Sequence, residues 1–316
     1  MEEYIPSAPL FRDPVYDGAA DPVVILNRET KEWWMFYTNR RAVLPGPKYS
    51  YVHGTDIGIA VSSDGGKTWL YRGIAEGLEF EWGRNTFWAP EVIYAGGKYH
   101  MYCTYLRGVP YEWGHMSYIV HYTSDSLYKW KFESVLELGS EPVIDACVRP
   151  MPDGSWKMWY KRDAHTYTAV SDDLYSWRET GLEIDGRGHE GPNVFSFMGY
   201  NWLIADCWNG QLVFRSDTFD KWQFKNIILD RPGKRPDDGF IGGHAHVVVC
   251  GARAYIFYFV HPERTEMNRN DERIHEEYGT KRSSIQVAEL VFDGDTLRCD
   301  RDAARPMLLV PEGQVY

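Results

Sequence analysis

The sequence predicts an all-β fold, namely a five-bladed β-propeller with four-stranded antiparallel blades. Two observations lead to this prediction. A short pattern recurs four times along the 316 residues, and each recurrence lies within a group of alternating, aromatic-rich segments. A fifth group of segments lacks the pattern but has the same order. Repeats of this length are typical of propellers, solenoids and other arrays of one structural unit.

The recurring pattern is Ser-Asp, four further residues and then Trp. It reads SDGGKTW, SDSLYKW, SDDLYSW and SDTFDKW, and its last residues are Trp69, Trp130, Trp177 and Trp222. Successive tryptophans are therefore 61, 47 and 45 residues apart. Ser and Asp side chains commonly close turns by bonding to nearby backbone groups. We therefore expect these turns to be structural and each Trp to pack between blades.

The segments of each unit alternate in the way that half-buried strands do. In chain order they are DPVVILN, WWMFYTN and IGIAVS; PEVIY, YHMYCTY and YIVHYTS; VIDACV, SWKMWYK and YTAVS; PNVFSF, WLIADCW and QLVFRS; and HVVVC, YIFYFV and IQVAELVFDG. β-branched and aromatic residues dominate them, as expected for strands. Helical periodicity is weak, and only 263–278 is suited to a short helix.

Five such units account for the whole chain, so we expect residues 1–316 to form a single propeller domain. We also expect a strand from one terminus to complete the last blade, because this closes the ring and removes an exposed edge. A solenoid of the same units is the alternative fold. Its ends would need capping segments, and the sequence offers none.

Composition excludes several classes of function. The chain has 34 Lys and Arg against 45 Asp and Glu, a net charge of −11, which argues against a nucleic-acid partner. Five cysteines without metal-ligand spacing predict buried thiols rather than disulfides. No apolar run is long enough for a membrane span, and the start MEEYIPSAPL shows no signal peptide, so a cytoplasmic location is the default expectation.

Propeller topology places the start of every first strand, and every loop between strands 2 and 3, on one face. The starts of the first strands read AADPVV, FWAPEV, PVIDACV, GHEGPNV and GGHAHVVV. They carry the candidate site residues Asp21, Glu91, Asp145, His189, Glu190, His244 and His246. Carboxylates beside a central channel are costly to desolvate. We therefore predict a functional site there, although a bound cation would equally explain them.

The loops on that face have unequal lengths. They are long in the first, second and fifth units, at roughly 39–55, 106–117 and 261–283, and short in the third and fourth. These three units are neighbours in a ring, so we expect a wall over a pocket on one side of the mouth. His53, Trp113 and His115 lie in these loops and are candidates for ligand contact.

The ordered motifs ADP, IDA and EGP, followed by GH in the fifth unit, resemble those of glycoside hydrolase family 43 and the related family 117. The resemblance implies that Asp21 is the general base, Asp145 a modulator and Glu190 the general acid. It also implies that His244 lies near the channel, and that Trp88, in the WAP segment, lines the sugar site. The chain departs from the family 43 pattern at Ala146, where the family usually has Pro.

The resemblance implies an exo-acting, inverting glycosidase that removes a terminal sugar from plant or algal oligosaccharides. Family 43 suggests arabinofuranosides or xylosides, and family 117 suggests anhydro-galactose ends. No cofactor is required, although some relatives hold a structural Ca²⁺ in the central channel, near the position of His244. The motifs do not indicate an oligomeric state.

Two other functions fit the same sequence. A phosphorylase would use phosphate in place of water, held by Arg149, Lys161 and Arg162 of the third unit. A non-catalytic carbohydrate-binding propeller would stack sugars on aromatic side chains and use the carboxylates as hydrogen-bond acceptors.

Overall fold

The structure is a computed structural model that describes residues 2–310. Its strands form five sheets. Blade I contains β1 (Ala19–Leu26), β2 (Trp33–Asn39), β3 (Asp56–Ser62) and β4 (Leu70–Ile74). Blade II contains β5 (Thr86–Ala95), β6 (Lys98–Leu106), β7 (Ser117–Ser124) and β8 (Lys131–Val135). Blade III contains β9 (Ile144–Pro150), β10 (Trp156–Arg162), β11 (His165–Ser171) and β12 (Arg178–Ile184). Blade IV contains β13 (Glu190–Phe197), β14 (Tyr200–Asp206), β15 (Gln211–Ser216) and β16 (Gln223–Ile228). Blade V contains β17 (Ala245–Cys250), β18 (Arg253–Val260), β19 (Ser284–Phe292) and β20 (Leu297–Cys299).

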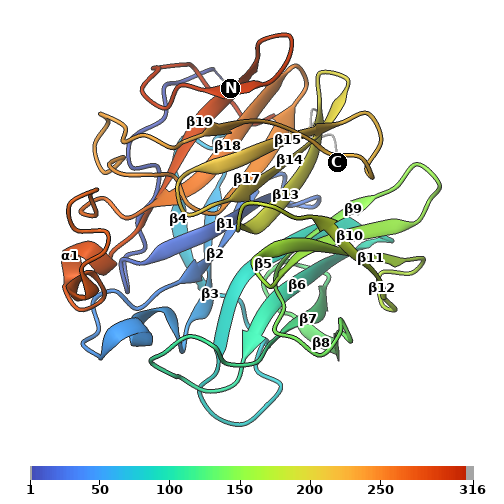
Figure 1. Ribbon diagram of the computed structural model, residues 1–316, viewed down its shortest axis with the longest axis horizontal. Coiled ribbons are helices and arrows are strands. Elements are labelled where there is room, and N and C mark those ends of the chain that lie inside the picture. Colours follow the sequence, from blue (N-terminus) through green and yellow to red (C-terminus); the bar gives the residue numbers. More distant parts are fainter. Residues whose placement is uncertain (1, 311–316) are drawn as a thin grey trace.

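The five sheets are arranged as a ring. Within each sheet the strands pair antiparallel in chain order, and the first strand of each blade lies nearest the centre, where β1, β5, β9, β13 and β17 meet (Figure 1). The inner strand of every blade contacts that of the next, and β17 contacts β1. The prediction of a five-bladed propeller with four-stranded antiparallel blades is therefore confirmed, and the solenoid alternative is excluded.

The ring closes in a different way from the one expected. Blade V takes all four strands from one continuous stretch of chain, so the expectation that a terminal strand completes it is wrong. Instead, the segment before β1 crosses the junction of blades V and I. Phe11 forms an isolated antiparallel bridge with Ile285 of β19, and Tyr4 forms another with Met307.

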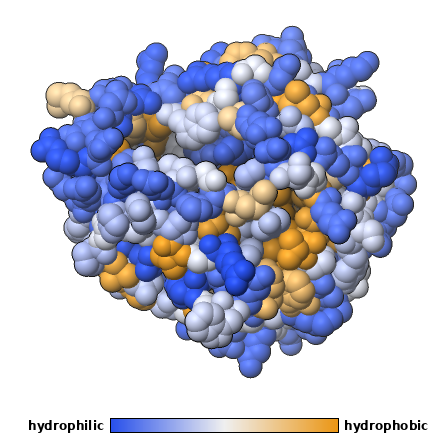
Figure 2. Space-filling view, turned by 60° about the horizontal axis from the view of Figure 1, so that its bottom comes forward, coloured by the Kyte–Doolittle hydropathy of each residue, from blue (hydrophilic) through white to orange (hydrophobic). Residues whose placement is uncertain are grey.

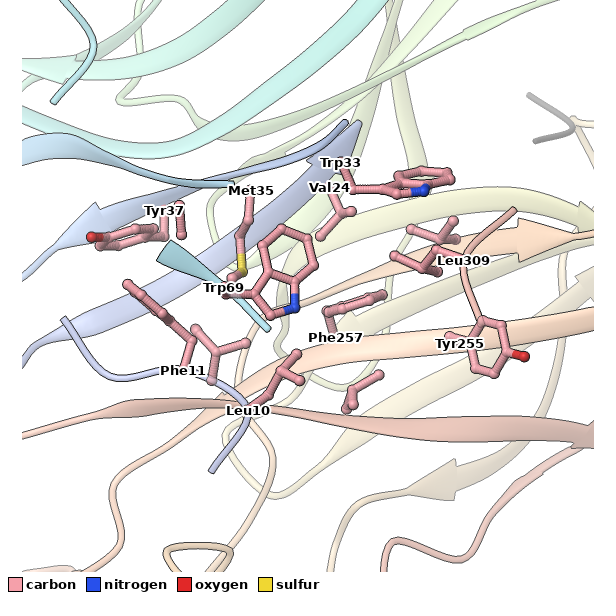
Figure 3. Close-up of a cluster of buried hydrophobic side chains, with 14 of the residues drawn as sticks. Leu10, Phe11, Val24, Trp33, Met35, Tyr37, Trp69, Tyr255, Phe257 and Leu309 are labelled. Atoms are coloured by element: carbon pink, nitrogen blue, oxygen red, sulfur yellow. The ribbon is translucent and has the colours of Figure 1, made fainter. Parts of the chain in front are cut away.

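Hydrophobic side chains fill the junction that this segment crosses (Figure 3). Leu10 and Phe11 of the N-terminal segment are buried there with side chains from β2 and β18. The Phe11 ring lies 5.3 Å from that of Tyr37, and the Trp69 ring lies 6.3 Å from that of Phe257 in an edge-to-face arrangement. Burial of these groups stabilises the closed ring.

The repeated turns are structural, as predicted. A Ser or Asp side chain accepts a backbone hydrogen bond within each turn; for example, Oγ of Ser124 accepts from the N–H of Leu127, and Oδ1 of Asp64 accepts from the N–H of Thr68. The tryptophans pack between blades. Trp130 meets Phe36 of blade I at 5.8 Å, and Trp177 meets Tyr102 of blade II at 5.6 Å.

A ring of hydrogen bonds joins the inner strands across the channel wall. The side chains of Glu91, Cys147, Asn193 and His246 occupy corresponding positions in blades II to V. Each accepts from a backbone N–H in the inner strand of the next blade, and the donors are Val148, Val194, Val247 and Val24. These donors lie on the channel-side edge of each sheet, where no further strand can satisfy them. We call these four side chains the acceptor ring.

The loop lengths agree with the sequence prediction. The loops between strands 2 and 3 are long in blades I, II and V and short in blades III and IV. The blade I loop contains the 3₁₀ helix η1 (Lys48–Val52). In the blade V loop, 263–278 contains only the 3₁₀ helix η2 (Glu272–His275) and the start of α1 (Tyr278–Lys281). The predicted helix is therefore shorter and lies later in the loop.

The surface and thiols agree with the composition. Figure 2 shows one face covered mainly by hydrophilic residues, with hydrophobic ones in small groups. All five cysteines are free, and four of them are buried. Among residues 2–310 we find no helix with the length and apolar character needed to cross a bilayer.

Candidate active site

A cavity of about 750 Å³ opens at the mouth where the first strands begin. The long loops of blades I, II and V wall it on one side, through residues such as Tyr51, Trp113 and Arg264. The short loops of blades III and IV border the other side, through Ala164 and Trp208. The predicted pocket, with its one-sided wall, is therefore present.

The inner strands share a backbone irregularity at this mouth. The register of β1, β5 and β13 shifts beside their partners at the ADP, WAP and EGP segments, and that of β9 shifts at IDA. At each shift one residue has a positive φ: Asp21 at 49°, Ala89 at 42°, Asp145 at 61° and Gly191 at 58°. β-Bulges of this kind re-aim side chains and are frequent next to active sites.

Asp21 is buried beside the cavity and is held by an arginine. Nη2 of Arg40 donates to both carboxylate oxygens, at 3.1 and 3.3 Å. Nδ1 of His244 lies 3.9 Å from Oδ1 of Asp21. Asp21 does not line the cavity itself, but these bonds join its carboxylate to Arg40, which does.

Asp145 is buried between blades III and IV. Its Oδ2 accepts from the backbone N–H of Gly191 at 3.0 Å, and its own N–H donates to Oγ1 of Thr104 at 3.0 Å. Burial raises the pKa of Asp145 to about 6; the neighbouring His244 opposes this rise, and the negative charge of Glu190 adds to it. Asp145 therefore titrates close to neutrality and is fixed to the residue that follows Glu190.

Glu190 reaches into the cavity, and its side chain is 28% exposed. Its Oε2 lies 3.5 Å from Nζ of Lys161, which also lines the cavity. The carboxyl group is therefore the most accessible of the three predicted catalytic groups, as a proton donor to a bound ligand must be.

A fourth carboxyl, Asp206, lies at the same mouth and was missed by the sequence reasoning. It ends β14, pairs with Glu190 across the sheet and lines the cavity. Burial raises the pKa of Asp206 well above its usual range, and the charge of Glu190 adds to the effect. The signal was present: IADCW places an Asp at the end of a second strand, on the face that carries the first-strand starts.

These acidic groups form one cluster. Both Asp21 and Glu190 contribute to raising the pKa of Asp145, and both contribute to raising that of Asp206. Such mutual effects require the groups to be close in space. The structure thus brings residues 21, 145 and 190 to the same end of the channel.

Aromatic side chains and histidines form the wall on the blade I and blade II side. His53, Trp88 and Trp113 all line the cavity, with ring separations of 5.2 to 6.0 Å. Nδ1 of His53 bonds to the carbonyl of Tyr49, whereas its Nε2 has no hydrogen-bond partner within residues 2–310. His115 also lines the cavity. These predicted contact residues are therefore placed where a sugar could meet them.

Four predicted substrate-binding residues do not line the cavity: His244, which lies beside Asp21, and Glu91, His189 and His246. Glu91 and His246 belong to the acceptor ring. Glu91 follows the bulge of β5, whereas β17 pairs with β18 without a register shift around His246. Burial raises the pKa of Glu91 and lowers that of His246 well below its usual value. His189 is buried and bonds to Thr166 and to the carbonyl of Arg187. The contacts of Glu91, His189 and His246 indicate structural roles.

Only one of the three residues proposed to hold phosphate lines the cavity. Arg149 is buried in the channel wall and donates to the carbonyl of Val194. Arg162 pairs with Glu179 at 2.7 Å and stacks over Tyr167. Lys161 does line the cavity, but its partner there is Glu190.

The channel residues fit a calcium ion poorly. Ca²⁺ prefers six to eight oxygen ligands, and the described residues include no group of three or more His, Cys, Asp or Glu side chains that could hold a metal ion. Arg149 already places a permanent positive charge near Glu91. A second cation beside it would be repelled.

The sequence reasoning also missed the basic residues of the cavity wall. Arg40 follows β2 directly, while Arg264 and Arg269 lie in the blade V loop. Arg40 could have been found from its place at the end of a second strand. The two loop arginines carry no such signal, because the path of a long loop does not follow from strand periodicity.

No protein-family model and no curated protein sequence matches this chain. Solved structures do match it. One is CoXyl43, a family 43 β-xylosidase/α-arabinofuranosidase from a compost microbial metagenome, in complex with xylotriose and in a calcium-free form. It has a TM-score of 0.69 and 17% identity, covering 94% of this chain and 98% of that one.

Two further matches have the same architecture. A thermostable family-43 glycoside hydrolase gives a TM-score of 0.68 at 18% identity, over 97% of this chain and 99% of that one. The α-L-arabinanase of Cellvibrio cellulosa, complexed with arabinohexaose, gives 0.61 at 16% identity, over 90% and 95%. This chain therefore shares the fold of family 43 glycoside hydrolases over almost its whole length.

Proposed function

We propose that this protein is a glycoside hydrolase that removes terminal sugars from oligosaccharides with inversion of configuration. The observation that carries the proposal is the cluster of Asp21, Asp145 and Glu190. Three separate blades supply these carboxyls to one mouth, beneath a cavity of about 750 Å³. Most glycosidases use a pair of carboxyl groups for catalysis.

In the proposed mechanism, Glu190 protonates the glycosidic oxygen of the leaving group. Its accessibility in the cavity suits this role. Asp21 accepts a proton from a water molecule that attacks the opposite face of the sugar ring. Arg40 orients the Asp21 carboxylate through two charge-assisted hydrogen bonds. Inversion requires the two carboxyl groups to be about 6.5–9.5 Å apart, so that water fits between them and the sugar.

Asp145 acts as a positioning residue in this scheme. Through its hydrogen bond to the N–H of Gly191, it fixes the backbone next to Glu190. Its titration near neutrality also makes the negative charge beside the acid depend on pH. Asp206 pairs with Glu190 across the sheet, and burial, together with the charge of Glu190, raises the pKa of Asp206 well above its usual range.

The one-sided wall over the cavity supports action at a chain end. The long loops of blades I, II and V close one side of the mouth, which suits a terminal sugar better than the middle of a polymer. The related structures were solved with xylotriose and arabinohexaose. We therefore propose pentose-containing oligosaccharides as the first substrates to test.

The test is a panel of aryl-glycosides and plant or algal oligosaccharides, with NMR detection of the anomer released. We expect a terminal monosaccharide whose anomeric configuration is opposite to that of the substrate. Products of mixed length would contradict exo-action, and retention would contradict the role of Asp21 as base. Strict dependence on added phosphate would favour a phosphorylase, and binding without turnover across the panel would favour a non-catalytic protein.

A further inference from the structure

The blade V side of the cavity contains an arginine without an acidic partner. Arg264 lines the cavity, donates through Nε to the carbonyl of Thr280 at 2.9 Å and through Nη2 to the hydroxyl of Tyr51 at 2.8 Å. Both acceptors are neutral. Within residues 2–310, no ion pair joins Arg264 to a carboxylate.

The other strongly basic residues that line the cavity do have acidic partners. Arg40 pairs with Asp21 at 3.1 Å, Lys161 with Glu190 at 3.5 Å, and Arg269 with Glu266 at 3.2 Å. The chain carries 45 acidic residues and a net charge of −11, so carboxylates are not scarce. The unbalanced charge of Arg264 is therefore a local property of this part of the wall.

The groups around Arg264 make its charge less favourable. Loss of solvent at this partly buried position lowers the pKa of Arg264; Tyr51 offsets part of this fall, and the positive charge of Arg40 adds to it. Two histidines beside it do not add charge at neutral pH. Burial and the nearby Arg264 lower the pKa of His275 to about 4, and that of His261 falls well below its usual value for the same reasons. A partly buried cation in such surroundings is stabilised most by an anion.

We propose that the sugar bound in this cavity carries an anionic group, a carboxylate or a sulfate, and that this group pairs with Arg264. The inference rests on the proposed glycosidase function and narrows its substrate class to acidic glycosides. The hydrogen bonds to Thr280 and Tyr51 hold the guanidinium in place, which prepares it for a planar or tetrahedral oxyanion. Arg40 lies close by, so the acidic group belongs to the sugar bound near Asp21.

Binding can be tested without turnover. Saturation-transfer NMR would compare galacturonate and glucuronate with galactose and glucose, and a galactose sulfate would separate sulfate from carboxylate recognition. We expect at least one acidic sugar to bind about tenfold or more tightly than its neutral counterpart. The preference should be lost in Arg264→Gln. Equal binding of acidic and neutral sugars by the unmodified protein would overturn the proposal.

A matched control lies in the same loop. Arg273 is exposed and pairs with Asp271 at 2.6 Å, so Arg273→Gln should keep the preference for acidic sugars. If Arg264→Gln does not fold, Arg264→Lys provides the second variant. It keeps the charge but loses the planar fork, so we expect the preference to fall without disappearing. An unchanged preference in Arg264→Lys together with a loss in Arg273→Gln would contradict the assignment.

Kinetics distinguish this inference from the function on which it rests. With matched aryl-glycosides and aryl-uronides, we expect Arg264→Gln to lower the ratio of kcat/KM for the acidic over the neutral substrate by about tenfold to a hundredfold. If neutral glycosides are cleaved faster and the ratio does not change, the inference fails and the glycosidase survives. If the protein cleaves neither class yet binds acidic sugars, the proposed function fails. Turnover that depends on inorganic phosphate would assign Arg264 to phosphate and overturn the acidic-sugar proposal.

Discussion

Asp21 and Asp145 adopt a backbone conformation that L-amino acids rarely use. Their φ values are 49° and 61°, and each of the two lies within the register shift of its strand. Left-handed backbone costs about 1–2 kcal/mol per non-glycine residue. Asp tolerates it better than most residues. The two residues with strained backbone are therefore the aspartates proposed as base and modulator. Backbone strain of this kind often accompanies functional sites.

Replacing the proposed acid or base should abolish most of the activity. We expect Glu190→Gln and Asp21→Asn each to lower kcat by about two orders of magnitude or more, because each removes one proton-transfer group. The measurement is the turnover of the best substrate in the aryl-glycoside panel, together with circular dichroism to verify folding. Asp153→Asn, in an exposed turn of blade III, is the matched control and should keep full activity. Near-normal turnover by either site variant would contradict the role assigned to that residue.

The raised pKa of Asp145 predicts a stability change that depends on pH. Its pKa rises from 3.8 to about 6 on folding. The charged form is therefore disfavoured in the folded state, and the cost to stability grows as pH increases from about 4 to above 6. Each pKa unit corresponds to about 1.4 kcal/mol. We expect Asp145→Asn to stabilise the protein by about 2–3 kcal/mol at pH 8 and hardly at all at pH 4.

Urea unfolding at the two pH values measures this effect. An Asn at position 145 can still accept the hydrogen bond from Gly191, so the comparison isolates the charge. Equal stabilisation at both pH values would show that the charge is not the cause. The same variant should also lose activity. Asp145 would then be a residue that supports activity while lowering the stability of the fold.

Individual residues show which parts of the candidate site could be predicted from the sequence. Asp21, Asp145 and Glu190 were found because they stand at strand starts, and topology gathers strand starts at one mouth. Glu91 and His246 stand in the same segments, yet they point into the channel wall. In blade II a bulge separates Trp88, which lines the cavity, from Glu91, which does not, whereas β17 of blade V has no register shift. Sequence alternation alone does not place a bulge, and so it cannot decide which side chains reach the cavity.

The bulge of β13 is the element on which the position of Glu190 depends. Gly191 has φ of 58°, and a Cβ there would lie 2.7 Å from the ring of His244. We expect Gly191→Ala to displace His244 from Asp21 and to shift the start of β13, because the ring cannot overlap the new methyl group. The expected result is a loss of activity of about tenfold or more, measured with the best aryl-glycoside.

The matched control for this variant lies at the other end of the same strand. Gly199 in the β13–β14 turn also has a positive φ, of 82°, but a Cβ there would meet no atom within 4 Å. Gly199→Ala therefore introduces similar backbone strain without a clash at the site. It should lower stability by about 1 kcal/mol and keep the activity. Equal losses of activity in both variants would show that backbone strain, and not contact with His244, is responsible.

At the scale of the whole molecule, ring closure depends on the segment before β1. Phe11 is buried between blades V and I, and its ring lies 5.3 Å from that of Tyr37. We expect Phe11→Ala to lower the free energy of unfolding by about 3–5 kcal/mol, the usual cost of removing a buried aromatic ring. Urea unfolding followed by tryptophan fluorescence measures this. Ile5→Ala, at a residue of the same segment that is 60% exposed, should cost less than about 1 kcal/mol. A similar small loss for Phe11→Ala would mean that the segment does not hold the ring closed.

The acceptor ring has a consequence for how such a protein can change over evolutionary time. A carboxyl, a thiol, an amide and an imidazole perform the same task at corresponding positions in four blades. The fold requires a hydrogen-bond acceptor that faces the backbone N–H of the next blade at each of these positions, but it does not require a particular amino acid. Descendants of one ancestor can therefore exchange these residues freely while the spacing of the blades is preserved. Related proteins can then keep the same arrangement of blades after their sequence identity has fallen very low.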